Sequence, residues 1–144
     1  MKLVLALMLL LGVAIGAVYF FGGFRDFDPS EQGRKAKAGI TPGMTWQQVV
    51  TVAGEPKEYR PIMKETKGSG ANKIELFKPG GPSKFVKTTL TARVGSNELP
   101  HGFVIDYQFS GSEAFRVTFD ETGSVVEVAD LMTMNDLLNY TPTR

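Results

Sequence analysis

The sequence lacks cysteine and has a single histidine in its 144 residues. Without cysteine the chain has no disulfide framework, no thiolate zinc site, no thiol nucleophile and no lipid-modified cysteine. His101 lies between Pro100 and Gly102 and is expected to be a turn residue, so no histidine-based metal site or serine triad is expected. The carboxylates are scattered singly, and no acid/base pair stands out. We therefore expect a non-enzymatic protein with no metal and no cofactor.

A long apolar run occupies the start of the chain. From Leu3 to Phe21 every residue is apolar or glycine, apart from Tyr19. A helix of this length just crosses the hydrocarbon core of a bilayer, which is about 30 Å thick. The sequence therefore predicts a transmembrane anchor at residues 1–22, which includes Leu3, Leu10, Val18 and Phe21.

The competing interpretation of this run is a cleaved secretory signal with a cleavage site near Ala14 and Gly16. Hydrophobicity continues past that site, which favours an uncleaved anchor. We expect a single-pass protein with a cytoplasmic amino terminus and a domain in the periplasm or outside the cell. Basic residues after the span, such as Arg25 and Arg34, leave a cytoplasmic domain as the alternative.

Two helices are expected in the remainder, which divides into a linker at residues 23–28 and a domain at 29–144. Asp28, followed by Pro29 at N1, predicts the first helix start, and Gly39 its end. The second helix has stronger signals, because Thr45 and Gln48 fit a capping box. Its apolar stripe recurs at helical spacing: Trp46, Val49, Val50 and Ala53.

Alternating apolar residues then predict strands. The first is short and contains Ile74 and Leu76, and the second is expected over residues 86–94. Residues 103–109 and 115–119 alternate in the same way. The last run leads through a turn at residues 120–123 to an outgoing strand with Val126 and Val128 facing inward, which describes an antiparallel hairpin. The fold class expected is therefore α+β, with two short helices packed on one face of an antiparallel sheet, preceded by one transmembrane helix.

Two segments of the exported part carry a family resemblance. The first has a Gly-Met-Thr helix start, a valine and a Gly-x-Pro stop, and comprises Ile40, Gly43, Met44, Thr45, Val49, Gly54 and Pro56. The second has an aromatic strand and a Phe-Asp-x-x-Gly-x-Val hairpin, and comprises Tyr107, Phe119, Asp120, Gly123 and Val125. With these segments the chain resembles the BamE-like domain, also known as SmpA/OmlA, of the outer-membrane β-barrel assembly machinery.

The resemblance implies two helices against a three-stranded antiparallel sheet, in a non-catalytic module that binds other envelope proteins. This chain departs from the family pattern in having no lipobox cysteine, so a helix would replace the lipid as the tether. Residues 57–100 exceed what the family places between its helix and its sheet, which implies an additional hairpin there.

The net charge of +1 hides an asymmetry, because basic residues dominate residues 55–94 and acidic residues dominate from residue 95 onward. Within the basic block we expect an interaction surface formed by Lys73, Lys78, Lys84, Lys87 and Arg93. An acidic partner protein or anionic lipid headgroups would fit it, and nucleic acid is not expected outside the cytoplasm. Edge-strand lysines that guard against aggregation are the structural alternative. A peripheral lipid binder and an enzyme-inhibitor-like module that uses the sheet face are the alternative functions.

Overall fold

A computed structural model describes residues 28–133 and residue 136 of the chain. The expected membrane anchor, with Leu3, Leu10, Val18 and Phe21, lies outside the described residues. Among those described, no helix is long and apolar enough to cross a membrane. The elements run in the order α2 (Pro29–Ala38), α3 (Trp46–Ala53), β1 (Glu58–Lys67), η2 (Gly70–Asn72), β2 (Ile74–Pro79), β3 (Ser83–Lys84), α4 (Lys87–Gly95), β4 (Phe103–Gln108), β5 (Ala114–Phe119) and β6 (Val125–Asp130).

The first two helices begin where the sequence predicts them. The Asp28 carboxylate accepts a hydrogen bond from the backbone N–H of Ser30 at 2.9 Å, and α2 ends at Ala38, before Gly39. At the start of α3 the capping box is complete, because Thr45 and Gln48 each accept a bond from the other's backbone N–H, at 3.4 and 2.9 Å. Local capping therefore fixes both helix starts.

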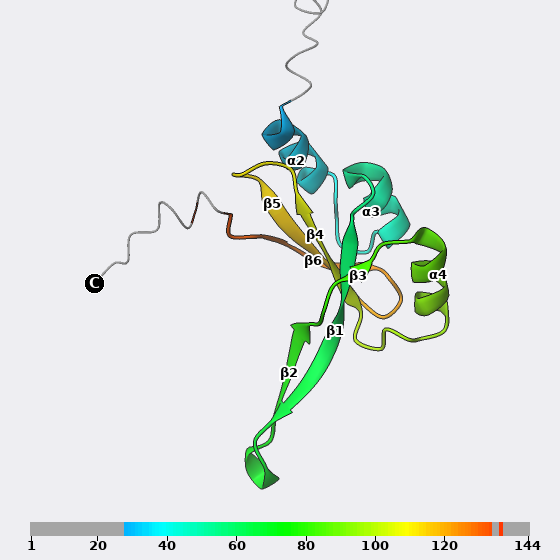
Figure 1. The fold of residues 1–144 in the computed structure, drawn as a ribbon, viewed down its shortest axis with the longest axis vertical. Helices are drawn as coiled ribbons and strands as arrows, with labels where there is room; N and C mark the ends of the chain where they lie inside the picture. The colour runs from blue at the N-terminus through cyan, green and yellow to red at the C-terminus, as the bar shows by residue number, and fades with distance from the viewer. Residues whose placement is uncertain (1–27, 134–135, 137–144) are drawn as a thin grey trace, which may run out of the picture.

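The sheet is antiparallel and curls into a half-barrel, with strand order β2-β1-β4-β5-β6 (Figure 1). The short β3 pairs with the beginning of β1, at Tyr59↔Ser83 and Glu58↔Lys84. β4 and β5 pair along their whole length, from Phe103↔Phe119 to Gln108↔Ala114. By contrast, β1 pairs with β4 at only two positions, Arg60↔Val104 and Pro61↔Phe103. The sheet is therefore continuous at the centre and opens on either side of the β1–β4 contact.

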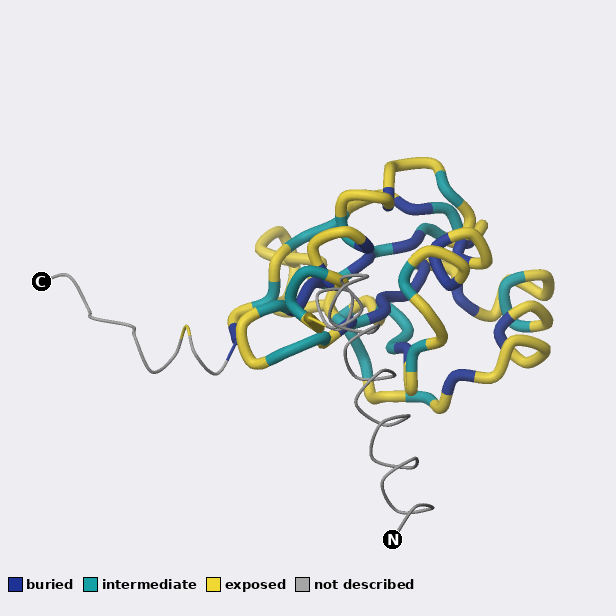
Figure 2. Tube along the Cα trace, turned by 90° about the horizontal axis from the view of Figure 1, so that it is seen from above, coloured by how far each residue is buried: buried dark blue, intermediate teal, exposed yellow. Residues whose placement is uncertain are grey.

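The core lies between the helices and the concave side of the curled sheet. Inward side chains of β4 and β5 are fully buried, as are Val49 of α3 and Leu90 of α4. The Phe103 and Phe119 rings stack with centroids 4.7 Å apart, and Trp46 meets Phe85 edge-on at 6.0 Å. Figure 2 shows these buried segments running through the middle of the domain, with exposed segments outside. The expected α+β class with an antiparallel sheet is thus confirmed.

The expected number of helices is wrong, because the described residues contain three α-helices. Residues 86–94, predicted as a strand, form α4. Leu90 is fully buried and Val94, one turn later, packs against the core, so the apolar residues also satisfy a helical period. The segment is rich in β-branched Val and Thr and has no side-chain N-cap, which explains why local preference pointed to a strand. Tertiary packing overrides that preference here.

The inward face of β6 also differs from the expectation. Val126 is exposed rather than buried, and Val125 takes the inward position. A register shift between Thr118 and Phe119 causes this change, since Phe119 pairs with Val125 while Thr118 pairs with Glu127. The extra residue is a β-bulge, which turns the following side chains to the opposite face.

A hairpin of β1 and β2 projects beyond the rest of the domain, and we call residues 62–79 the arm. Its strands pair from Ile62↔Pro79 to Lys67↔Ile74. Figure 1 shows the arm at one end of the long axis and α2 at the opposite end. Residues 67–73 form the arm's tip, which contains η2. The start of the described chain and the arm's tip therefore lie at opposite poles.

Candidate binding site

The two segments that carry the family resemblance meet in the structure, although they are far apart in the sequence. The Gly43 N–H donates to the Val125 carbonyl, the Val125 N–H donates to the Met44 carbonyl, and the Trp46 N–H donates to the Gly123 carbonyl, each at 2.8 Å. Thr45 forms an isolated bridge with Ser124 beside them. This junction fastens the beginning of α3 to the β5–β6 hairpin.

The remaining motif residues lie in the core, at the end of α3 and in the turn between β5 and β6. Ile40, Val49 and Phe119 are buried in the core. Gly54 ends α3 with a φ of +90°, a conformation that favours glycine. The Asp120 carboxylate accepts hydrogen bonds from the N–H groups of Thr122 and Ser124 in the turn between β5 and β6. Of the motif residues, Pro56 and Tyr107 line a groove on the described domain.

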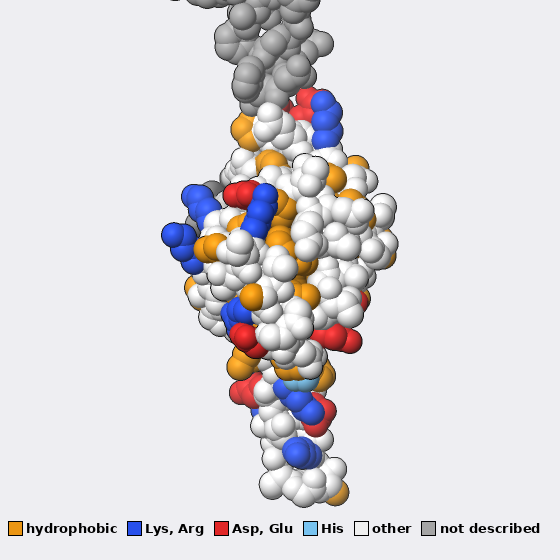
Figure 3. Space-filling model, turned by 90° about the vertical axis from the view of Figure 1, so that its right-hand side faces the viewer, with side chains coloured by type: hydrophobic (Ala, Val, Ile, Leu, Met, Phe, Trp, Pro, Cys, Tyr) orange, Lys and Arg blue, Asp and Glu red, His pale blue; other side chains and the backbone are white. Residues whose placement is uncertain are grey.

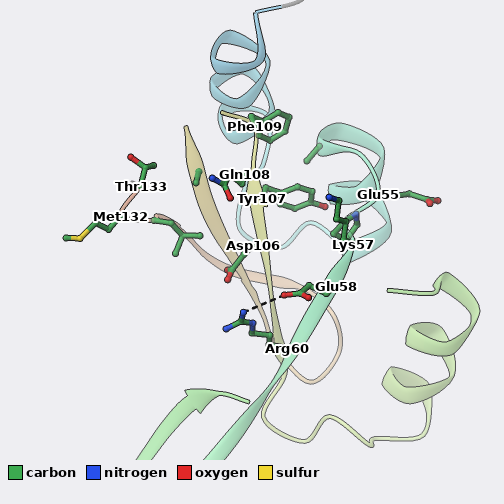
Figure 4. Close-up of a pocket in the computed structure, with 14 residues that line it drawn as sticks. Glu55, Lys57, Glu58, Arg60, Asp106, Tyr107, Gln108, Phe109, Met132 and Thr133 are labelled. Atoms are coloured by element: carbon green, nitrogen blue, oxygen red, sulfur yellow. Dashed lines mark ion pairs between the residues drawn. The ribbon is translucent and has the colours of Figure 1, made fainter. Parts of the chain in front are cut away.

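That groove, which we call the β4 groove, has a volume of about 780 Å³. Its lining comes from the end of α3 and the α3–β1 connection, the beginning of β1, residues 106–109 at the end of β4, the first residue of β5, and the chain after β6. It opens where β1 and β4 separate beyond their contact at Arg60 and Val104. Figure 4 shows the side chains of these elements lying around the opening. The sequence did not indicate this site, because it arises from the divergence of two strands.

Charges around the β4 groove are mostly paired. Arg116 binds Asp106 with two hydrogen bonds, at 2.6 and 2.7 Å, and this contact raises the pKa of the Arg116 guanidinium. Glu58 lies 3.5 Å from Arg60, the pair marked in Figure 4. Glu55, also on the lining, pairs outward with a lysine of α4 at 2.8 Å. Each of these three carboxylates therefore has a cationic partner.

Tyr107 fixes one wall of the β4 groove. Its hydroxyl donates a hydrogen bond to the Gly54 carbonyl at 3.1 Å, which ties β4 to the end of α3. Burial raises the pKa of Tyr107 well above its ordinary value, so the phenol stays protonated and keeps donating. Figure 4 shows the Tyr107 ring pointing towards α3, on the other side of β4 from Asp106. The uncharged Tyr107 hydroxyl thus links this wall to the end of α3.

The expected basic surface is spread over several elements. Lys73 precedes β2, Lys78 lies in it, Lys84 belongs to β3, and Lys87 and Arg93 lie on α4. Lys78 pairs with Glu65 and Lys87 pairs with Glu55. Arg93 donates to the Tyr59 hydroxyl at 2.6 Å and pairs with Glu98. Three of the five cations therefore have an acidic partner, and the other two, Lys73 and Lys84, have no ion pair with a described residue.

The arm exposes apolar side chains. Met63, Leu76 and Ile74 share one face by register, with Ile74 60% exposed, and Phe77 on the other face is 58% exposed. Phe77 touches His101 edge-on at 5.2 Å, and His101 occupies the predicted turn. Figure 3 shows acidic and basic side chains interspersed along the arm, at the lower end of the view. The arm therefore exposes apolar side chains on both faces, among four lysines and two glutamates.

Within the described residues, no cluster of three or more histidine, cysteine or acidic side chains is arranged to hold a metal ion. Comparison with known proteins found no matching family model, no matching curated protein and no matching solved structure.

Proposed function

We propose that this chain is a membrane-tethered, non-catalytic protein-binding module of the cell envelope. The supporting observation is the β4 groove, which presents half-buried apolar surface and an unpaired stretch of strand β4 to solvent. Its three carboxylates are each held by a cation, so the groove does not gather free acid and base groups of the kind that enzyme sites use. Protein recognition needs only such shape and hydrogen-bonding capacity.

The tether in this proposal is the apolar run at residues 1–22, with the amino terminus in the cytoplasm and the domain in the periplasm or outside the cell. A likeness to the BamE-like domain agrees with an envelope role, and the junction between its two motif segments is consistent with it. A reporter that is active only outside the cytoplasm, fused after Arg144, is expected to be active. An inactive reporter would refute the exported orientation.

Charge pairing favours a protein partner over a lipid surface. Anionic lipids attract clusters of unpaired cations, at about 1 kcal/mol for each Lys or Arg near the membrane. In the basic set, Lys78, Lys87 and Arg93 already have acidic neighbours. The arm, which carries part of this set, also lies at the opposite pole from Asp28, where the chain emerges from the predicted tether.

In-cell photo-crosslinking tests the binding function. A photoreactive residue replaces Met132, which is 66% exposed and lines the β4 groove. The matched control places the same residue at Thr88, on the exposed surface of α4. We expect a discrete adduct with one envelope protein from Met132 and none from Thr88. Absence of any discrete adduct from Met132, with full-length protein present in the membrane, would contradict the proposal.

A further inference from the structure

Strand β4 has one edge that is paired along its length and one that is paired only at its beginning. The backbone groups of successive residues in a strand point alternately to its two edges. On the β1 side, the Gly102 carbonyl accepts from the Ile62 N–H at 3.0 Å, and on the β5 side the Phe109 N–H donates to the Glu113 carbonyl at 3.0 Å. Even-numbered residues of β4 therefore direct their N–H and C=O groups towards β1.

Beyond Val104, no strand in the described part of the chain lies opposite these groups. Continuing the register would bring Glu58 opposite Asp106, but the pairing of β1 with β4 ends at Arg60. The N–H and C=O groups of Asp106 and Gln108 thus face the β4 groove, and in the described part of the chain no strand pairs with them there. Among the residues that the structure describes, these four successive main-chain groups have no strand partner.

This edge differs from the outer edge of the arm. Strand β2 carries Lys78 and ends in Pro79, two features with which proteins protect an edge from added strands. The free stretch of β4, from Asp106 to Gln108, has neither lysine nor proline. It is also flanked by the walls of a groove, which an edge open to solvent on all sides lacks. The β4 edge is therefore suited to specific pairing.

The groove walls indicate the side chains that an added strand would carry. Alternate residues of such a strand point to opposite sides of the sheet. On the helix side they meet the apolar surface of Ala53 and Phe109, and on the open side they meet Arg60. Lys57 lines the groove too, and among the described residues it has no ion pair. With the carboxylates of the groove already paired, the uncompensated charge is positive and an acidic side chain complements it.

We propose that the β4 edge binds an extended segment of an envelope partner, with alternating apolar and acidic side chains, as an added antiparallel or parallel strand. This inference rests on the proposed protein-binding function and adds the partner's chemistry and its mode of attachment. Main-chain hydrogen bonds to Asp106 and Gln108 hold the segment, and side-chain contacts select it.

Binding of synthetic peptides to the full-length chain in detergent micelles tests the inference. The probe is a fluorescent peptide of about nine residues that alternates valine and glutamate, and the comparison peptides alternate valine and lysine or carry N-methylated amides. We expect the valine–glutamate peptide to bind with a Kd below about 100 μM by fluorescence anisotropy. The valine–lysine and N-methylated peptides should each bind at least about tenfold more weakly.

Two substitutions at one position separate the backbone from the side chain. Gln108→Pro removes an N–H that faces the groove and leaves the ladder with β5 intact, so the domain should keep its melting temperature. It should weaken binding of the valine–glutamate peptide by about tenfold or more. Gln108→Thr keeps the N–H and should change the affinity for this peptide by less than about twofold. Lys57→Glu should weaken binding of the same peptide by about fivefold and strengthen binding of the valine–lysine peptide.

Hydrogen exchange provides a readout that does not depend on these variants. On binding the valine–glutamate peptide, the amides of Asp106 and Gln108 should become protected, because they then donate to the added strand. No peptide binding up to about 1 mM, equal binding of the N-methylated peptide, or unprotected amides in the complex would overturn the inference. If Met132 still yields its discrete adduct in the Gln108→Pro chain, the binding function stands and strand addition at β4 is wrong.

Discussion

In the body of the domain, Phe103 and Phe119 are fully buried and stack against each other, whereas in the arm Phe77 keeps more than half of its surface exposed. Both regions use regular antiparallel pairing, so hydrogen bonding does not distinguish them. The difference is that three helices cover the body's sheet, while both faces of the arm are open. Stability therefore resides in the body, and the arm is a two-stranded ribbon that depends on it.

The sharpest test of this contrast truncates one aromatic ring in each region. Phe119→Ala removes a fully buried ring and should lower the free energy of unfolding by about 3–5 kcal/mol. Phe77→Ala removes an exposed ring whose one aromatic neighbour among the described residues is His101, and it should lower the free energy of unfolding by less than about 1 kcal/mol. Urea denaturation of both variants measures the difference. Equal losses would show that the arm is packed against something in solution.

A pair of glycines with positive φ extends the comparison to the backbone. Gly102 in the body has a φ of +77°, and an added Cβ would lie 1.9 Å from the Phe119 carbonyl oxygen. Gly70 at the arm's tip has a φ of +62° and open space around it. Gly102→Ala should lower the free energy of unfolding by about 2–4 kcal/mol, because the left-handed strain and the clash act together. Gly70→Ala should cost about 1 kcal/mol, from strain alone. Thermal unfolding distinguishes them, and a Gly102→Ala chain as stable as Gly70→Ala would contradict the packing described.

Replacing single carboxylates should have the smallest effects on the free energy of unfolding. Partial burial alone would raise the pKa of Asp120, but hydrogen bonds from Thr122, Ser124 and Gly123 outweigh it and hold that pKa below its ordinary value of 3.8. Asp120→Ala should lower the free energy of unfolding by about 1 kcal/mol at pH 7, a small value because solvent screens this carboxylate. In the arm, Glu65→Gln breaks an exposed pair with Lys78 and should cost less than about 0.5 kcal/mol.

The pH dependence of the Asp120 contribution has a definite sign. A carboxyl with a lowered folded-state pKa stabilises the fold at every pH above its unfolded-state value. The gap in unfolding free energy between the parent chain and Asp120→Ala should therefore stay constant down to about pH 4. It should shrink as pH falls further, through the folded-state pKa. A gap that widens below pH 4 would contradict the hydrogen bonds assigned to this carboxylate.

The sequence specified α3 because its signals are local: Thr45, Gln48 and Gly54 determine where the helix begins and ends whatever surrounds it. The sequence pattern predicted a strand where the structure has α4. Leu90 and Val94 fit the spacing of both a strand and a helix, and only packing against the core decides between them. Asn97, with a φ of +57° just after α4, is a C-terminal signal that could have favoured the helix.

The β4 groove was beyond prediction for a related reason. Its free edge depends on where the register between β1 and β4 stops, at Arg60 and Val104, and those residues are distant in sequence. The alternation of Phe103, Ile105 and Tyr107 predicts a strand with one buried face but says nothing about which neighbour each edge has. The Val126 bulge escaped prediction because it too is a property of two paired strands.

The junction between α3 and the β5–β6 hairpin has a consequence for how the domain is made. The Trp46 N–H and the Gly123 carbonyl are about 75 positions apart, a long loop to close before their bond can form. During synthesis on the ribosome, α3 emerges well before its docking surface exists. The domain must therefore reach its native state late, after β6 has appeared, and its apolar helix face is exposed to chaperones or aggregation until then.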